Sequence, residues 1–287
     1  MRETAGAKVN LCLEVTGKLP DGYHGVRGIM QSLEFGDTVE LEPGNGPWQV
    51  RSGLAYLPDN GENLAARAAV LFRRLTGLGP EGGVITLEKR IPVCGGFGGG
   101  SSDAAAVLRL LNRECGFPLS WSELETVSLE LGADVPFCIR GGTALAEGKG
   151  ECLTPLPDLA GVHVVLCRPD FLCSTQELFR AIDRLKLRLK PDVSGMVKAV
   201  EEGDLPGVAR RMFNVFEAAL SRTQADQVRN LKNALLDSGA LGAAMTGSGS
   251  GVFALFGDAA SAEGAAEALR GMGVRAEHTV TTGRLAD

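Results

Sequence analysis

The segment "IPVCGGFGGGSSDAAAVLRLLN", Ile91–Asn112, decides the fold. Glycine occupies every position from 95 to 100 except 97, and two serines, an aspartate and an alanine- and leucine-rich run follow. Strong helix formers make up that run, so we expect a helix over 104–111 with Ser101 or Ser102 at its N-cap. A glycine loop between a strand and a helix start is typical of a phosphate site, because free backbone N–H groups and the helix dipole favour an anion.

Two familiar phosphate loops are excluded by the residue that follows the glycines. The Walker pattern requires Lys after its last glycine, but Ser101 follows Gly100. The dinucleotide pattern requires a third glycine where Ser101 stands after Gly96 and Gly98. The alternative is a turn that only lets a helix pack on a sheet. The number of glycines favours a ligand against the main chain, since each costs about 0.5–1 kcal/mol relative to alanine in regular structure.

A second glycine-serine segment, "MTGSGSGVFALF" at 245–256, precedes a strand-like apolar run. Taken alone, a flexible β-turn explains this segment equally well. Together with the first loop, it suggests a polyphosphate that is held from two sides.

Composition limits the classes of function. The 287 residues suffice for one large or two ordinary domains, and the net charge is −6. The mixed run "RLKLRLKP" at 184–191 is the one basic cluster, and we expect it to be a solvated helix face or loop, so nucleic acid is not a predicted partner.

No apolar segment approaches the roughly 18–20 residues that span a bilayer, and the opening residues form no signal peptide. We therefore expect a cytoplasmic protein without membrane contact.

Seven cysteines and three histidines could suggest a metal cluster, but no C-x-x-C pair occurs. We expect reduced and mostly buried thiols instead.

Near the N-terminus, apolar residues alternate from Val9 to Val15, which predicts a half-buried strand. Lys8 and Asn10 then project from its opposite face. Pro20-Asp21-Gly22 predicts a tight turn, from which Tyr23 and His24 emerge.

Strands are further predicted over 37–41 and 84–89, with a helix between them that begins after an Asn63 N-cap. Ser120 and Glu123 have the spacing of a capping box, and Gly132 is a predicted helix stop, which places Asp134 just past a helix end.

Two prolines near 155–160 mark a domain boundary. Beyond it we expect a strand, three or four helices, strands over 243–246 and 252–256, a helix over 259–272 and a strand near 274–280. Strands and helices without strict alternation indicate an α+β fold in both halves, with domains over 1–157 and 158–287.

Three blocks in this order, the strand with Lys8, the loop over 91–103 and the segment over 245–251, resemble the GHMP kinase superfamily of galacto-, homoserine, mevalonate and phosphomevalonate kinases. Within it, the sequence is similar to the 4-diphosphocytidyl-2-C-methyl-D-erythritol kinase family. The matching motifs are "AKVNLCLEVTGKLPDGYH" at 7–24, "GGGSSDAA" at 98–105 and "LGADVPFCIRGGTALAEGKGE" at 131–151. The resemblance covers most of the chain, more thinly over 160–240. Gly6 replaces a frequent proline and Phe97 a more frequent leucine, and the latter bears on nucleotide affinity.

The resemblance implies a two-domain α+β fold with the active site in the interdomain cleft. It also implies an ATP-dependent small-molecule kinase of non-mevalonate isoprenoid synthesis, which phosphorylates the 2-hydroxyl of 4-diphosphocytidyl-2-C-methyl-D-erythritol. ATP chemistry implies Mg²⁺, although no ligand spacing identifies the residues that would hold it.

The resemblance further implies the roles of individual residues. Asp134 would be the catalytic base and Lys8 its cationic neighbour. The implied substrate-binding residues are Asn10, Tyr23, His24, Lys89 and Phe179. The implied nucleotide-binding residues are Asn63, Pro92, Val93, Cys94, Gly95, Gly96, Phe97, Gly98, Gly99, Gly100, Ser101 and Ser102.

Other interpretations stay open at this stage. Without the resemblance, Asp134 is equally well explained as a helix-end aspartate, Lys89 as part of a strand edge, and Phe179 as a core residue. A homoserine- or mevalonate-type kinase would share the loop but have no use for Tyr23 and His24. A nucleotide-binding regulator without catalysis would be expected to lack Lys8 or Asp134. The sequence leaves the oligomeric state undecided.

Overall fold

The structure is a computed structural model that describes residues 1–185 and 190–286, so half of the basic run over 184–191 lies outside the described residues. Two β-sheets organise this part of the chain. The first consists of β1 Arg2–Lys18, β2 His24–Gly44, β3 Gln49–Arg51, β4 Gly82–Glu88, β5 Thr143–Glu147, β6 Cys152–Pro155 and β8 Phe213–Asn214. The second consists of β7 His163–Cys167, β9 Gly242–Met245, β10 Val252–Phe256 and β11 Ala276–Val280.

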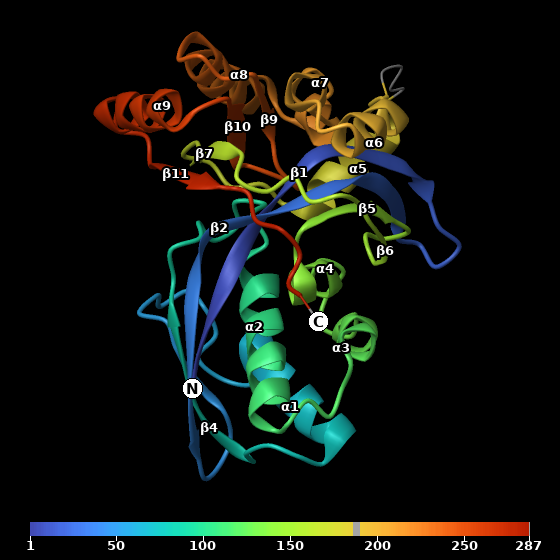
Figure 1. Cartoon of the computed structure of the whole chain (residues 1–287), viewed down its shortest axis with the longest axis vertical. Helices are drawn as coiled ribbons and strands as arrows, with labels where there is room; N and C mark the ends of the chain where they lie inside the picture. The colour runs from blue at the N-terminus through green and yellow to red at the C-terminus, as the bar shows by residue number, and fades with distance from the viewer. Residues whose placement is uncertain (186–189, 287) are drawn as a thin grey trace.

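The long antiparallel pair β1 and β2 forms the spine of the molecule. Both strands run from the region of β4 to the region of the C-terminal helices (Figure 1). β2 pairs with β4 over residues 38–44 and with β5 over residues 28–31, so one strand serves two neighbours. The short strand β8 joins the other edge of β1 in parallel, although it comes from the second half of the chain.

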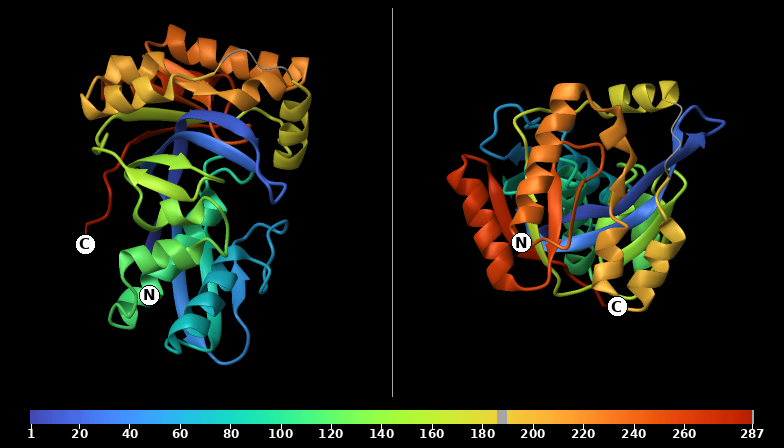
Figure 2. Two further views of the ribbon diagram at one scale, coloured as in Figure 1. Left: turned by 90° about the vertical axis from the view of Figure 1, so that its right-hand side faces the viewer. Right: turned by 90° about the horizontal axis from the view of Figure 1, so that it is seen from above.

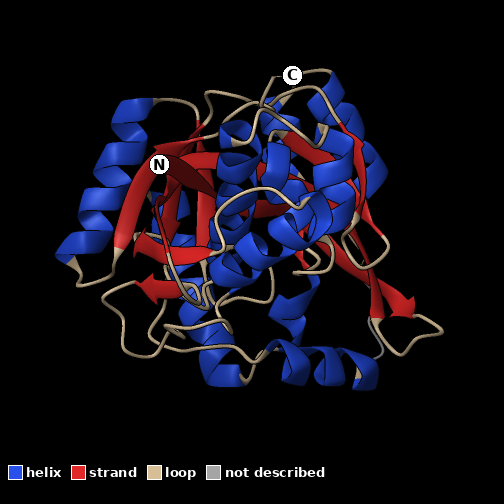
Figure 3. Ribbon diagram, turned by 90° about the horizontal axis from the view of Figure 1, so that it is seen from below, coloured by secondary structure: helices blue, strands red, loops and turns tan. Residues whose placement is uncertain are grey.

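Nine α-helices and one 3-10 helix surround the sheets in the described part of the chain. They are α1 Leu64–Thr76, α2 Gly99–Glu114, α3 Trp121–Ser128, α4 Val135–Arg140, α5 Thr175–Arg184, α6 Val193–Glu201, α7 Leu205–Arg210, η1 Val215–Ala219, α8 Arg222–Asp237 and α9 Ala259–Gly271. The helices α6 to α9 form an outer layer over one end of the molecule (Figure 2). Seen from below, helices lie in front of much of the strand structure (Figure 3).

The second sheet has the order β11-β7-β10-β9 and is antiparallel throughout. The mixture of strands and helices confirms the predicted α+β class. The chain passes from the first sheet to the second between β6 and β7, and the boundary proposed after residue 157 falls in this connection.

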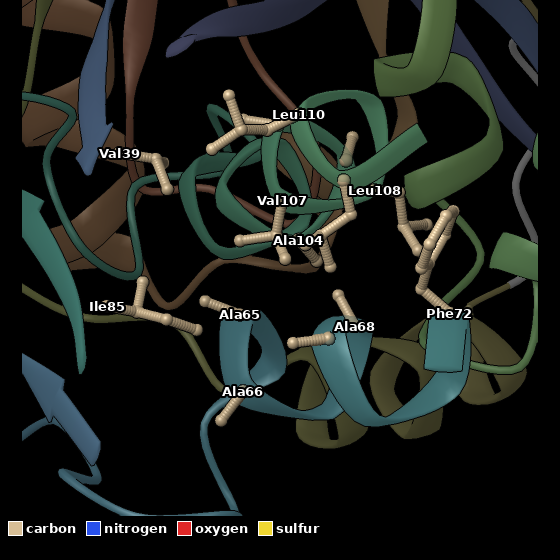
Figure 4. Close-up of a cluster of buried hydrophobic side chains, with 14 of the residues drawn as sticks. Val39, Ala65, Ala66, Ala68, Phe72, Ile85, Ala104, Val107, Leu108 and Leu110 are labelled. Carbon is tan, nitrogen blue, oxygen red and sulfur yellow. The ribbon is translucent and has the colours of Figure 1, made fainter. Parts of the chain in front are cut away.

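Small side chains let α1 pack closely on α2. Alanines such as Ala65 and Ala68 face Ala104 and Val107, and Ile85 closes the cluster from the sheet (Figure 4). All of these side chains are buried. Close packing of this layer holds the start of α2, and with it the glycine loop, against the first sheet.

The helix starts and stops were predicted with mixed success. Asn63 caps α1 and Ser120 forms the capping box of α3, as predicted. α2, however, begins at Gly99 after a left-handed Gly98, so the prediction of a serine N-cap was wrong, and Ser101 and Ser102 lie in the first turn. α3 ends at Ser128 rather than near Gly132, because i→i+3 hydrogen bonds over 126–131 replace the α-helical i→i+4 pattern there.

Burial differs from the prediction in β1 and at the cysteines. β1 was predicted to be half-buried, but Lys8 and Asn10 are buried like the apolar Val9 between them, because the glycine loops cover that face. All seven cysteines are free thiols as expected, yet only Cys12 and Cys167 are fully buried. No helix in the described ranges has both the length and the apolar character needed to cross a membrane.

Candidate active site

The two glycine loops interlock. The amide of Gly251 donates to the carbonyl of Gly95 over 2.9 Å. A Cβ atom on Gly96 would lie 2.2 Å from the carbonyl oxygen of Thr246, which is backbone and cannot yield. The sequence suggested that the glycines leave room for a ligand. The structure shows that some of them are needed because the two loops pack against each other.

Gly98 has a separate function at the start of α2. Its φ of +75° is left-handed, and a Cβ atom there would lie 2.8 Å from Cγ of Lys8. The neighbouring carbonyl of Phe97 accepts a 2.9 Å hydrogen bond from the Lys8 amide. The glycine loop thus sets the start of the helix and the position of the catalytic lysine candidate together.

The loop lines a cavity of about 430 Å³, called cavity 1 here. Of the residues predicted to bind nucleotide, those that line it are Asn63, Pro92, Val93, Cys94, Gly95, Gly96, Phe97, Gly98, Gly99, Gly100 and Ser101. Ser102 is the exception, because its hydroxyl points away and donates to the carbonyl of Gly6 over 2.6 Å. The side-chain amide of Asn63 caps α1 and donates to Pro58, so its polar atoms already have partners.

Lys89 also lies at cavity 1, not with the predicted substrate-binding residues. Its ammonium pairs with the buried carboxylates of Asp37 and Asp103. Asp37 in addition accepts hydrogen bonds from the amides of Arg90 and Ile91, which fixes the chain where it leaves β4. The cluster therefore ties the glycine loop to β2 and α2.

The charges of this cluster are unequal, since two carboxylates share one ammonium. Burial raises the pKa of the Asp103 carboxyl to about 7, despite the opposing effect of Lys89. Burial acts to lower the pKa of Lys89, but Asp103 and Asp37 together outweigh it and that pKa is raised. A proton on Asp103 near neutral pH leaves a neutral buried cluster, which costs less than a buried net charge.

Lys8 and Asp134 meet at the centre of the site. Nζ of Lys8 lies 3.1 Å from Oδ2 of Asp134 and 2.9 Å from Oδ1 of Asn10. Oδ1 of Asn10 also accepts from the amide of Gly247, so the second glycine loop supports the lysine. The side chain of Lys8 is 4% exposed and that of Asp134 is 35% exposed, which gives a buried cation beside an accessible carboxylate.

Asp134 is the N-cap residue of α4, so its predicted place just past a helix end was wrong. Its side chain makes no capping hydrogen bond and turns to Lys8 instead. A carboxylate that forgoes its usual capping partner is free to act on a ligand.

A second cavity of about 900 Å³, called cavity 2, opens beside Tyr23 and His24. The His24 ring stacks on Phe179 with centroids 4.6 Å apart, and its Nε2 lies 2.8 Å from Oδ1 of Asp183. Phe179 also packs edge-on against Phe216, so it belongs to the core and to the cavity at once. Gly132 and Ala133 line cavity 2 as well, which brings it up to the neighbouring Asp134.

Tyr23 is 64% exposed, and its ring lies under the ammonium of Lys149 at 4.3 Å. Lys149 pairs with Asp21, and hydrogen bonds from Lys149 and the Tyr23 amide lower the pKa of that carboxyl. The D-G-Y-H turn is thereby fixed at the rim of cavity 2.

Several residues of the site were absent from the sequence-based set. Thr246 accepts a hydrogen bond from the Asn10 amide, and Asp37, Asp183 and Lys149 hold predicted residues in place. Thr246 lay inside the quoted second glycine segment, and Asp37 was an unexplained charge within a strand. Asp183 and Lys149 gave no local signal, because their partners are distant in sequence.

Comparison with known proteins agrees with this arrangement. The family model "GHMP kinases N terminal domain" matches residues 63–142, and "GHMP kinases C terminal" matches residues 196–275. A 4-diphosphocytidyl-2-C-methyl-D-erythritol kinase of Clostridium perfringens is 40% identical over 272 residues, which is 94% of each chain.

Solved structures give the same result. A crystal structure of 4-(cytidine 5'-diphospho)-2C-methyl-D-erythritol kinase is 34% identical with a TM-score of 0.82, covering 99% of this chain and 100% of that one. A homoserine kinase of Cytophaga hutchinsonii is 21% identical with a TM-score of 0.76 over 99% of this chain and 95% of that one, and shares the fold. The chain is thus a member of the GHMP kinases and belongs to their 4-diphosphocytidyl-2-C-methyl-D-erythritol kinase family.

Proposed function

We propose that this protein transfers the γ-phosphoryl group of ATP to the 2-hydroxyl of 4-diphosphocytidyl-2-C-methyl-D-erythritol, giving the 2-phosphate and ADP. The observation that carries the proposal is the Lys8–Asp134 pair, which adjoins cavity 1 through Gly98 and cavity 2 through Ala133. A donor phosphate and an acceptor alcohol bound in the two cavities would meet at this pair.

Asp134 accepts the proton of the attacking hydroxyl in this scheme. Lys8 stabilises negative charge at the attacking oxygen. Little covalent chemistry is left to the protein in phosphoryl transfer, so positioning and charge stabilisation carry the reaction. The buried Lys8, held by Asn10 at 2.9 Å, suits that positioning.

The donor phosphates would lie against the glycine loop at the N-terminus of α2. The first backbone N–H groups of a helix have no intrahelical partner, and the helix dipole adds positive potential there. Gly99, Gly100 and Ser101 occupy this first turn and line cavity 1.

The oxygen donors at cavity 1 fit a Mg²⁺ ion that arrives with the nucleotide. Oδ1 of Asp103 is buried with no hydrogen-bond partner among the described residues, and Ser101, two residues earlier in α2, lines the same cavity. Mg²⁺ usually keeps several waters and uses one or two protein oxygens plus phosphates, which agrees with the lack of any group of three metal-ligating side chains among the described residues. When bound, the ion would neutralise charge on the phosphates, with Ser101 and Asp103 as its protein ligands.

The cytidyl end of the acceptor would occupy cavity 2. Stacking on Phe179 and polar contacts from His24 suit a pyrimidine ring, and Tyr23 is exposed at the rim. Nε2 of His24 faces Asp183, which leaves its Nδ1 for a polar contact with the edge of the ring.

The decisive experiment is a coupled ADP-release assay with three acceptors measured side by side: the cytidyl substrate, homoserine and mevalonate. We expect turnover with the cytidyl substrate alone. Turnover with homoserine or mevalonate but not the cytidyl substrate would overturn the proposed acceptor. ATP hydrolysis that is indifferent to all three would overturn the kinase activity itself.

A further inference from the structure

The position of Asp134 depends on α4, a helix too short to stabilise itself. α4 has six residues, and Asp134 makes no capping bond to it. Whatever fixes α4 against β1 therefore sets the distance between Asp134 and Lys8. The contacts that do so come from the opposite end of α4.

The last four carbonyl groups of a helix have no partner within it. In α4 the C-cap residue Gly141 serves one of them, and groups from other segments serve the remaining three. Gly141 donates to Phe137 over 2.8 Å, and Leu285 of the C-terminal segment donates to Arg140 over 2.9 Å. The two carbonyls between them are both served by Arg109 of α2. Its Nη1 donates to Cys138 over 2.7 Å and, more weakly, to Ile139 over 3.5 Å.

Arg109 reaches β1 with the other half of its guanidinium. Nη2 donates to the carbonyl of Thr4 over 2.7 Å and lies 3.5 Å from Oε1 of Glu3. The planar fork therefore joins the helix that carries Asp134 to the strand that carries Lys8. A positive charge at the C-terminus of α4 is also favourable to that helix.

Ser102 makes a parallel link two helical turns earlier in α2. Its hydroxyl donates to Gly6 of β1 over 2.6 Å and lies 3.4 Å from Sγ of Cys138. Residues 102 and 109 are seven apart and so share one face of the helix. This face of α2 contacts both elements that hold the catalytic pair.

The Arg109 side chain is only 9% exposed, and burial lowers its pKa while Glu3 opposes that effect. Its Nε has no hydrogen-bond partner among the described residues. Burying an arginine whose N–H groups are not all hydrogen-bonded destabilises the fold. Stability of the fold therefore does not explain why Arg109 is buried here, and its contacts with α4 and β1 suggest a second role.

We propose that Arg109 is a positioning residue that fixes the Lys8–Asp134 distance by holding α4 against β1. The inference rests on the proposed function of that pair. Arg109 does not line cavity 1 or cavity 2, so it acts on the rate of transfer and not on binding of either substrate.

The test compares three variants of the full-length protein. Arg109→Ala removes the fork, and Arg109→Lys keeps the charge but cannot serve both carbonyls with a planar group. Arg113→Ala is the matched control, because Arg113 is on the same helix and pairs with the same Glu3 but is 44% exposed. In the described part of the chain its polar contacts are with Glu3, Glu114 and the Arg2 carbonyl, and none is with α4. Steady-state kinetics, nucleotide affinity by calorimetry and the folded fraction by circular dichroism are measured for each.

We expect Arg109→Ala to lower kcat per folded molecule by about 10- to 100-fold, since misplacement of about 1 Å costs up to this much. Nucleotide affinity and both KM values should stay near wild type, Arg109→Lys should be intermediate, and Arg113→Ala should be unchanged. Arg109 lines a cavity of about 260 Å³ that is also lined by Lys8, so added guanidinium should enter and partly restore kcat of Arg109→Ala, whereas urea should not.

Several results would overturn the inference. They are a kcat of Arg109→Ala equal to that of Arg113→Ala, a loss explained wholly by a smaller folded fraction, or a loss matched by weaker nucleotide binding. An absence of rescue by guanidinium at concentrations that leave the protein folded would also count against it. Failure of the proposed function is distinguishable, because wild type would then not phosphorylate the cytidyl substrate and Asp134→Asn would have no effect.

Discussion

The ammonium of Lys8 lies 3.1 Å from Oδ2 of Asp134, a contact that joins a buried strand to the N-cap residue of a short helix. Since Lys8 is buried and Asp134 is accessible, a ligand can contact the pair through the Asp134 carboxylate. Asp134→Asn should therefore lower kcat by about 10²–10⁴-fold in the coupled ADP-release assay, the usual loss when a general base is removed.

The same pair should behave as a unit. Lys8→Met alone should also lower kcat, and the double variant should be little worse than the slower single variant, because effects within one catalytic unit are not additive. Lys198→Met is a suitable control, since that side chain is 72% exposed on α6. An Asp134→Asn variant with nearly full kcat would refute the role of Asp134 as base.

The His24–Phe179 stack predicts a selective effect on the acceptor. His24→Ala and Phe179→Ala should raise KM for the cytidyl substrate roughly 5- to 150-fold, which corresponds to about 1–3 kcal/mol of base stacking. KM for ATP should not change, because neither residue lines cavity 1. Phe117→Ala serves as the control, since this exposed aromatic lies at the far end of α2 from the glycine loop. If only KM for ATP rose, the D-G-Y-H turn would bind the nucleotide and not the cytidyl substrate.

Local sequence signals predicted much of this molecule. The N-cap Asn63, the capping box at Ser120 and the strand β1 were each predicted from residues a few positions apart, and the structure contains all three. The glycine loop was recognised for the same reason.

Features that depend on distant segments could not be predicted in this way. Lys89 meets Asp37 and Asp103 only because β2, β4 and α2 converge, and so its placement at cavity 1 was missed. Ser102 was grouped with its loop neighbours, although the helix turns it toward Gly6. Gly96 packs against Thr246, which is 150 positions away in the sequence. A count of glycines alone therefore assigned too many of them to ligand binding.

That interlock gives a prediction about stability. Gly96→Ala should lower the free energy of unfolding by at least roughly 1–2 kcal/mol, the cost of a left-handed alanine, because its Cβ would also meet the Thr246 carbonyl. Gly264→Ala in the exposed face of α9 meets no atom within 4 Å and should raise stability by about 0.5–1 kcal/mol. Urea denaturation of both variants checks this. Equal effects of the two substitutions would mean that the loops are not packed together.

The Lys89–Asp37–Asp103 cluster predicts a pH dependence of stability. The folded Asp103 carboxyl keeps its proton up to about pH 7, whereas its ordinary pKa is 3.8. The folded state then binds more protons between these values, so the free energy of unfolding contributed by this group falls as the pH rises through the interval. Asp103→Asn cannot titrate. The stability of wild type minus that of Asp103→Asn should therefore decrease between pH 5 and pH 8, measured by urea denaturation at each pH.

Asp258 provides the matched control for that measurement. Hydrogen bonds from the Ser261 amide and hydroxyl lower the pKa of its carboxyl, so its contribution to stability is present above the ordinary value and lost only in more acidic solution. The difference between wild type and Asp258→Asn should accordingly stay constant from pH 5 to pH 8. If the Asp103→Asn difference were equally constant, the buried carboxyl would be ionised throughout, and Lys89 would be neutralising two carboxylates instead of one.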